Sequence, residues 1–502
     1  MSESQPDPWS LIAFEGFSGL NTQSARPGIK DDEMAWVDGF MPVGDNFLRT
    51  LPGPGSPIFY WQNGSIIAWF DFSVIGGVPY CYAFPLDGSI WRININTNAP
   101  SQAAPPGTIQ LGGPKFAGLS QWGRQYTIIV CTQSNGYFVD DGTTLYLPGQ
   151  TVPGVGVVPS GIGGQGVETY QGRVWVTNGP YISFSAPQSV IDFSSANGGG
   201  TVESFDSFLR TSYTTPLQTN GFLYLLADSS INYIAGVQTS GSPPVTTFTN
   251  QNADPEVGTI YGNSVDVLGS NIIFANAWGV HVSYGGRVSK VSSALDGVYQ
   301  TAGIGWNGFE ASAAKAIVYG KRLWGVLIPI INPLSDALEN RMFLWDEKRW
   351  FTCIPNPSTT TTFVQHLEFN SALSAYGTDG KSIYPLFAQT NTSPKIVQSK
   401  LWGRPKGYMY QKASNRPWLL LQYFSPTNPT VLFSTENETF TSNTVAITPS
   451  PTDLSSGYKF YTSPPVASTI DGALIGMTIT TNAADVALIS CAVDAVEAGY
   501  RG

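Results

Sequence analysis

Charged residues and histidines are scarce in this sequence. Only 12% of its 502 residues are Asp, Glu, Lys or Arg, about half of the usual share, and the only histidines are His281 and His366. Neither histidine has a cysteine or a second histidine at ligand spacing, which argues against the usual zinc sites. A Ser-His-Asp system would have to use one of these two histidines, and the sequence has no G-x-S-x-G motif. The residues therefore give no positive evidence for hydrolytic or zinc chemistry.

Cysteines and long hydrophobic runs are also few. Four cysteines, Cys81, Cys131, Cys353 and Cys491, lie far apart in apolar contexts, so we expect buried free thiols rather than disulfides. The N-terminal MSESQPDPW has no apolar core typical of a signal peptide. The longest apolar run, LWGVLIPII at 323–331, is too short for a membrane span. We expect a protein that is made and folded in a cytoplasm and has no membrane span.

Basic residues are fewer than acidic ones. Lys plus Arg number 25 and Asp plus Glu 35, which gives a formal net charge of −10 at pH 7. An acidic chain without a basic run is a poor candidate for holding nucleic acid phosphates, although it can border nucleic acid. A surface with so few charges is explained either by coverage in an assembly or by an ordinary surface of Ser, Thr and Asn.

Glycine, proline and strand-favouring residues are abundant instead. The 54 glycines and 36 prolines favour many turns and few long helices. Thr, Ser, Asn, Tyr and Val fill much of the remainder and favour strands. We expect an all-β protein whose length allows several domains or one large β unit.

A turn followed by a short alternating strand recurs through the middle of the chain. The strands read SIWRI from Ser89, TLYL from Thr144, YISFS from Tyr181, SINYI from Ser230, VHVSY from Val280, MFLW from Met342 and SIYPLF from Ser382. Four turns, Asp87-Gly88, Asp141-Gly142, Asn178-Gly179 and Asp379-Gly380, can supply the positive φ of tight hairpins. From Ser89 to Ser382 the six intervals average about 49 residues, which is typical of four-stranded blades. We predict a β-propeller of six to eight blades, with seven favoured, over residues 57–394.

A second element precedes several of these hairpins. A glycine-containing turn, often with a basic residue, leads into an apolar strand in WGRQYTIIV (122–130), QGRVWVTN (171–178), NGFLYLLA (220–227), GSNIIFAN (269–276) and YGKRLWGVLI (319–328). We interpret each as the inner strand of a blade, apolar on both faces because it packs between neighbouring blades. We expect the Arg or Lys at its start to cover a blade edge or cap a turn rather than to bind a ligand.

The two ends of the chain differ from the repeats. Residues 1–56 are expected to form an extended, proline-stiffened N-terminal segment, with a short helix in 30–40 that Asp31 or Asp32 caps and Gly39 ends. The basic stretch 393–417 is interpreted as a linker. Residues 395–502 are then a β-sandwich-like platform module, with strands near 418–424, 430–434, 440–447, 457–462, 474–480 and 486–493.

Three motifs match functional patterns by letter, and each has a structural interpretation. GIGGQG (161–166) matches G-x-G-x-x-G, but a strand follows it, so no helix N-terminus is expected to cradle a pyrophosphate. Asp140-Asp141 lies at a hairpin turn, and Asp31-Asp32-Glu33 at the predicted helix start, where acidic residues are favoured for backbone reasons. A catalytic acid pair has no positive support from these residues.

Fourteen tryptophans also allow a glycan-binding interpretation, since indole rings can stack on sugars. Most lie in strand-like contexts such as RVWV and MFLWDEKRWF, which favours packing within and between blades. The Asn-x-Ser/Thr sequences at Asn63, Asn391 and Asn437 carry no weight without a secretory signal.

The order of several segments resembles tail nozzle proteins of short-tailed bacteriophages. The run FSGLNTQSARPGIKDDEMAWVDGFMPVGDNFLRTLPG (17–53) resembles their N-terminal segment, which reaches the propeller through a Gly-Phe-Leu-Arg-x-x-Pro-Gly-like stretch, here 46–53. The segments 172–193, 274–293 and 375–387 look similar too. The chain end, GALIGMTITTNAADVALISCAVDAVEAGYRG, resembles the last strands of their platform module.

The resemblance implies a structural virion protein of the phage tail rather than an enzyme. It implies a ring of six copies, assembled in the host cytoplasm, that lies below the portal and its adaptor and continues and closes the DNA ejection channel. It also implies contacts with tail fibres or spikes, and packaged DNA that passes without specific binding. It implies no catalytic, cofactor-binding or metal residue and no cofactor. The alternatives are a glycan-binding propeller module and a propeller glycosidase or lyase.

Overall fold

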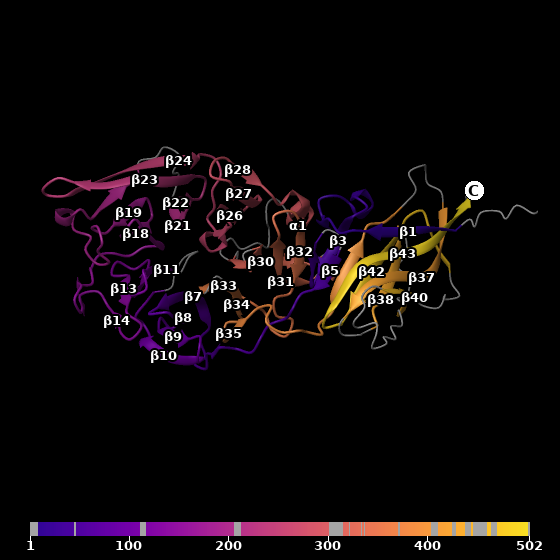
Figure 1. Cartoon of the computed structure of the whole chain (residues 1–502), viewed down its shortest axis with the longest axis horizontal. Helices are drawn as coiled ribbons and strands as arrows, with labels where there is room; N and C mark the ends of the chain where they lie inside the picture. Colours follow the sequence, from indigo (N-terminus) through magenta and orange to yellow (C-terminus); the bar gives the residue numbers. More distant parts are fainter. Residues whose placement is uncertain are drawn as a thin grey trace, which may run out of the picture.

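The structure is a computed structural model that describes most of the chain. The described residues are 9–44, 47–110, 117–204, 212–300, 315–320, 322–332, 334–335, 337–369, 372–402, 410–423, 428–436, 443–444, 459–462 and 469–499. Helical elements in these ranges are short: α1 (Asp296–Gln300), η1 (Arg26–Gly28), η2 (Ser195–Asn197), η3 (Gly262–Ser264) and η4 (Ser293–Leu295). Strands form two units, a propeller and a sandwich, which lie side by side in Figure 1.

Four-stranded antiparallel blades surround the propeller axis. The first two are β7 (Ile67–Ile75), β8 (Val78–Pro85), β9 (Ile90–Asn94), β10 (Ala99–Ala104) and β11 (Ala117–Trp122), β12 (Tyr126–Cys131), β13 (Tyr137–Asp140), β14 (Leu145–Tyr146). A small hairpin, β15 (Thr151–Val152) and β16 (Gly156–Val157), precedes the third blade, β17 (Gly166–Tyr170), β18 (Arg173–Asn178), β19 (Tyr181–Phe184), β20 (Gly200–Glu203). The fourth is β21 (Tyr213–Thr219), β22 (Phe222–Ala227), β23 (Ile231–Ser240), β24 (Val245–Asp254).

Three further blades complete the circle. They are β25 (Asp266–Leu268), β26 (Asn271–Asn276), β27 (Gly279–Ser283), β28 (Val288–Lys290); β29 (Lys315–Tyr319), β30 (Leu323–Ile331), β31 (Leu338–Trp345), β32 (Trp350–Cys353); and β33 (Phe363–Phe369), β34 (Ala372–Thr378), β35 (Ser382–Pro385) with β6 (Phe59–Tyr60). The predicted all-β propeller is therefore confirmed, and the described strands form seven blades, the favoured number.

The ring of blades is closed by a strand from the start of the propeller. β6 precedes the first blade in sequence but pairs with β35 of the seventh, with Phe59 opposite Ile383 and Tyr60 opposite Ser382. The innermost strand of the seventh blade, β33, contacts β7 of the first. Opening the ring therefore requires breaking a sheet as well as a blade-to-blade contact.

The hairpin turns have the predicted geometry. Gly88, Gly142, Gly179 and Gly380 have φ of 79°, 88°, 59° and 88°, a region that side-chain-bearing residues rarely adopt. Asp87 and Asp379 accept hydrogen bonds from backbone N–H groups within their own turns. The Asp-Gly and Asn-Gly pairs thus set where the strands turn.

The apolar strands predicted to be inner ones are the second strands of their blades, not the innermost. β12, β18, β22, β26 and β30 match the five predicted segments, and their central residues are almost all buried. A second strand has sheet neighbours on both edges and other blades on both faces, so it must be apolar throughout. The innermost strands border the axis, and several place polar residues there, such as Asp71 of β7, Glu168 of β17 and His366 of β33.

The second unit is a two-sheet sandwich. One sheet has the order β4 (Phe40–Val43), β5 (Phe47–Thr50), β43 (Val486–Gly499), β37 (Tyr410–Tyr423), β40 (Lys459–Thr462), with β1 (Trp9–Glu15) beside β43 and β41 (Thr469–Gly472) beside β37. The other has β3 (Glu33–Asp38), β36 (Lys395–Ser399), β42 (Ile475–Thr481), β38 (Thr430–Thr435), β39 (Asn443–Thr444), with β2 (Gly19–Leu20) beside β3. The basic stretch 393–417 is therefore not a linker, because it contains β36 and the start of β37; residues 403–409 lie outside the described residues.

Two predictions for the N-terminal segment are wrong. Residues 33–38 form β3 rather than a short helix, because Met34, Trp36 and Val37 are buried between neighbouring strands and the sandwich core. The segment is not an extended lead-in either, since β1 to β5 complete both sheets of the sandwich. Tertiary pairing with strands from the C-terminal end overrides the local helix pattern.

The propeller and the sandwich share one continuous sheet. The outermost strand of the sixth blade, β32, pairs in parallel with β3, with Thr352 opposite Asp38. Gly39 N–H donates to the Thr352 carbonyl at 2.8 Å, and Thr352 Oγ1 donates to the Val37 carbonyl at 2.7 Å. The result is a ten-stranded sheet that runs from the propeller axis into the sandwich.

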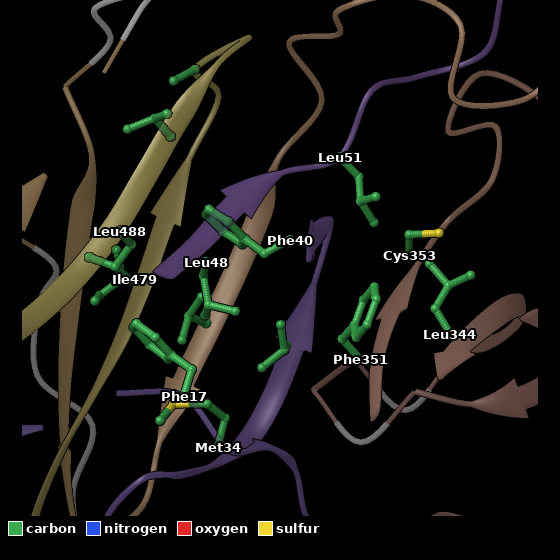
Figure 2. Packing of buried hydrophobic residues seen from close by; sticks show 14 of the residues in the cluster. Phe17, Met34, Phe40, Leu48, Leu51, Leu344, Phe351, Cys353, Ile479 and Leu488 are labelled. Carbon is green, nitrogen blue, oxygen red and sulfur yellow. The ribbon is translucent and has the colours of Figure 1, made fainter. Parts of the chain in front are cut away.

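The hydrophobic core is continuous across the same junction. Figure 2 shows Phe17, Phe40, Leu48, Ile479 and Leu488 between the sandwich sheets, and the same cluster continues to side chains of the sixth blade, Leu344, Phe351 and Cys353. All of these side chains are buried. The two units are therefore joined by a shared core as well as by backbone hydrogen bonds.

Candidate functional site

A polar cavity of about 530 Å³ lies on the propeller axis. We call it the central cavity. Residues from the innermost strands of all seven blades, or next to them, line it: Trp69, Asp71, Leu119, Val167, Glu168, Thr215, Pro216, Leu217, Gln218, Asn263, Val265, Asp266, Val267, Ala316, Val318, Gln365, His366 and Glu368. Its lining includes four carboxylates and one imidazole.

Three of these carboxylates also satisfy the inner edges of their blades. An innermost strand has no neighbour on the axis side, so some of its N–H groups lack a ladder partner. Asp71, Glu168 and Asp266 each accept a hydrogen bond from the N–H of the next residue, at 2.7, 2.9 and 2.7 Å. Part of the acidity of the cavity therefore has a structural use.

Side chains also link different blades across the central cavity. Gln365 Nε2 donates to Asp71 Oδ1 at 2.8 Å, which joins the seventh blade to the first. Ser120 Oγ donates to Glu168 Oε1 at 3.2 Å, which joins the second to the third. His366 Nδ1 lies 3.1 Å from Asp266 Oδ2, so the seventh blade also reaches the fifth. The cavity is lined by interacting polar groups rather than by isolated charges.

The acidic surroundings hold His366 toward its charged form. Burial favours the neutral imidazole, but the carboxylate of Asp266, with further contributions from Asp71 and Glu368, outweighs this and raises the pKa of His366. The sequence showed a second histidine but nothing that placed it beside Asp266, which is 100 positions away in the chain. This pair is the feature of the cavity that sequence reasoning missed.

The other histidine has a packing position. His281 lies in the buried strand β27, stacked at 5.7 Å on the ring of Phe274, and burial lowers its pKa. This agrees with its interpretation as a strand residue. Among the described residues, no group of three or more His, Cys, Asp or Glu side chains is placed to hold a metal ion.

The Asp140-Asp141 pair is split between two structural contacts. Asp140 is fully buried and pairs with Arg92 of the first blade, whose Nη1 lies 2.6 Å from Oδ1. Burial raises the pKa of Asp140, and the charge of Arg92 opposes this. Asp141 accepts hydrogen bonds from Thr143 N and Thr144 N of its own turn. The two carboxylates therefore do not act on a shared ligand site.

The remaining motifs also lie in structural places. Residues 161–166 lead directly into β17 and then β18. Asp31 pairs with Lys400 at 2.7 Å, and Glu33 with Lys30 at 3.6 Å. All four cysteines are buried and free, as predicted. Most of the described tryptophan side chains are buried, but Trp278 is 70% exposed.

A second cavity, of about 310 Å³, lies beside the junction with the sandwich. Arg341 pairs there with Asp38 at 2.6 Å and also contacts Glu339. Lys395 donates to the carbonyls of Asn391 and Ser393, both at 2.9 Å, and burial lowers its pKa to about 8. These charges compensate one another and hold the junction.

Comparisons with known proteins add only a likeness of fold. No protein-family model and no curated protein matches the chain. Similar solved structures include YCF48 bound to D1 peptide (8% identity, 67% of this chain and 97% of that chain, TM-score 0.38) and a streptogramin B lyase (10%, 68% and 97%, 0.39). A third is the β-propeller domain of Myceliophteria thermophila Cps50 (Swd1), at 9% identity over 68% and 99% of the chains and a TM-score of 0.37. None of these likenesses bears on what this chain binds.

Proposed function

We propose that the chain is a structural subunit of the tail nozzle of a short-tailed bacteriophage and is not an enzyme. Six copies form a ring that continues the DNA ejection channel below the portal and adaptor, and closes it until infection. Tail fibres or spikes contact the outside of this ring. The chain then resides in the virion tail after assembly in the host cytoplasm.

The observation that best supports a mechanical role is the continuous ten-stranded sheet through Thr352 and Asp38. A flexible linker would let the propeller and the sandwich move independently. Here backbone hydrogen bonds and a shared core resist such motion. A rigid subunit of this kind suits a ring that must withstand the pressure of packaged DNA.

The charge of the chain also fits a passage for DNA. The net charge of −10 per chain multiplies in a ring, and acidic walls repel phosphate. Within the described ranges, no helix is long and apolar enough to cross a membrane. DNA would pass such walls without being held.

Electron microscopy of the purified full-length protein tests the proposal. We expect hollow rings with six-fold symmetry, and no binding of duplex DNA at any salt concentration. Particles of single chains would contradict the ring. Tight DNA binding that weakens with salt would contradict the passage.

The central cavity favours one alternative, a propeller that binds or cleaves glycans. Carboxylates and amides such as Asp71, Glu168 and Gln365 can accept and donate hydrogen bonds to sugar hydroxyls. A glycan array with the isolated monomer tests binding. Hydrolysis or elimination of a glycan that is lost on changing Glu168 to Gln would favour an enzyme, and inactivity on all glycans favours the nozzle.

A further inference from the structure

The strand order gives the propeller two chemically different ends. Each innermost strand starts at the end where the chain passes from blade to blade, and this end also holds the turns between second and third strands. We call it the connection side. The turns between first and second strands, and between third and fourth, lie at the other end, the hairpin side.

Exposed hydrophobic side chains gather on the connection side. Among described large hydrophobic side chains, those more than half exposed there are Tyr60, Leu86, Val157, Trp278 and Leu338, against Val245 and Tyr284 on the hairpin side. Of those between about a third and a half exposed, all but Phe222 and the sandwich residue Val43 also end on the connection side. Such an uneven distribution marks an interaction surface rather than scattered apolar residues.

The connection side also has a groove that a partner could fill. A groove of about 460 Å³ lies next to Leu338, which is 70% exposed, and Ile354 and Pro357 form part of its wall. Trp278, also 70% exposed, lies in the turn of the neighbouring fifth blade, where its backbone N–H donates to Asn276 Oδ1 at 2.9 Å. An exposed indole in a hydrogen-bonded turn, next to a groove, is a typical anchor of a protein interface.

The balance of exposed charges differs between the two ends. On the connection side, Asp87, Asp228 and Asp379 lie half-buried in turns, with Glu203 and Glu256 exposed near them. Two lysines are exposed there, Lys381 and Lys290, and Lys290 is paired with Asp296, so acids predominate. Two copies that met through this side alone would place these acids opposite one another, which is unfavourable. Isologous pairing of two connection sides is therefore disfavoured.

The hairpin side carries exposed basic residues. Arg124, Arg287, Arg322 and Lys348 lie in its turns and are exposed. Two exposed acids, Glu347 and Glu368, also lie at this side, and Asp346 is paired with Arg349 at 2.8 Å. Two half-buried acids, Asp141 and Asp192, accept hydrogen bonds within their own loops, so the exposed charges on this side are mainly basic. The hairpin side of one copy can therefore face the acidic, apolar connection side of another with complementary charge.

We propose that the connection side packs against the hairpin side of a second copy of this chain, and that this heterologous contact builds the ring. The inference rests on the proposed nozzle and adds its interface. A contact between two different surfaces can repeat from copy to copy until it closes. It also sets the orientation of each propeller, whose axis then follows the circumference of the ring and not the direction of DNA.

Complementation between two variants tests the contact. One variant carries Trp278→Asp with Leu338→Asp on the connection side, and the other carries Arg124→Asp with Arg287→Asp on the hairpin side. All four residues are exposed, so folding should be unchanged by circular dichroism and melting. The control, Val43→Asp, changes an exposed residue of the sandwich.

Size-exclusion chromatography with light scattering gives the mass of each sample. We expect rings for the wild type and the control, single chains for each variant alone, and a 1:1 dimer when the variants are mixed, because each retains one intact side. Assembly of either variant alone, or a mixture that stays monomeric, would refute the proposed contact but not the proposed nozzle function. A monomeric wild type would overturn both.

Discussion

Replacing Arg92 by methionine should destabilise the propeller through the carboxylate that it leaves behind. Arg92 is 8% exposed at its side chain and pairs with the fully buried Asp140 of the next blade. Its Nη2 also donates to the Thr143 carbonyl at 3.0 Å. Methionine keeps the apolar stem but removes the cation, so Asp140 is left as a buried charge without its partner.

The cost follows from this geometry. Removing one partner of a buried ion pair costs about 3–5 kcal/mol. Burial already raises the pKa of Asp140, so the carboxyl can take up a proton and avoid part of this cost, which gives about 3 kcal/mol. A cooperative unit of roughly 330 residues has an unfolding entropy of about 0.7 kcal/mol/K, so Tm should fall by about 4 °C.

Differential scanning calorimetry of single and double variants is the assay. Arg92→Met with Asp140→Asn leaves no buried charge, so the double variant should melt above Arg92→Met alone. Lys30→Met, which changes an exposed lysine outside the blades, is the control and should change the unfolding free energy by under about 0.5 kcal/mol. A fall of less than 1 °C for Arg92→Met, or strictly additive losses in the double variant, would refute the reasoning.

Three further predictions concern other contacts. Arg173 donates to the Gly198 carbonyl and to Thr246 Oγ1, both at 2.9 Å. Arg173→Ala should therefore speed hydrogen exchange in β23 and β24 but not in β7 to β9. An equal change in exchange rate in both regions would contradict this. The interactions that raise the pKa of His366 stabilise the fold fully below the unfolded pKa of about 6.5, and less as pH rises through the folded pKa. The Tm of the wild type should therefore drop from pH 6.5 to 8 more than the Tm of His366→Gln. Parallel curves of Tm against pH would disprove the coupling. Deleting residues 1–50 removes β1 to β5 and should leave the sandwich open to trypsin while the blades stay protected; a protease-resistant sandwich would show that these strands are dispensable.

Short-range patterns made the propeller predictable. The Asp-Gly and Asn-Gly turns fix where strands reverse, and the average spacing of the recurring strands from Ser89 to Ser382 matches the length of one blade. Both signals can be read from the sequence without knowledge of tertiary contacts. Local sequence could not show whether an apolar strand is the second or the innermost strand of its blade. This depends on which strand borders the axis, and the polar residues of β17 and β25 become meaningful only once that cavity exists.

The strands of the N-terminal segment and the residues of the central cavity could not be predicted from the sequence, because both depend on contacts between distant parts of the chain. The pattern of Asp31 to Gly39 favours a helix in isolation, but pairing of Val37 with Val397 makes it a strand. His366 and Asp266 meet because the seventh and fifth blades both face the axis, not because of any spacing in the chain. The nozzle function stays a prediction, which the ring and complementation experiments test.

The first described strand, β1, pairs with the last, β43. Trp9 lies opposite Val496, so β1 cannot pair until residues 487 positions further along the chain have been synthesised. At about 5–20 residues per second, this delay is at least about 25 s, during which the blades can fold. A product that stops before β43 therefore lacks a finished sandwich, because β1, β5 and β37 all lose their shared sheet neighbour.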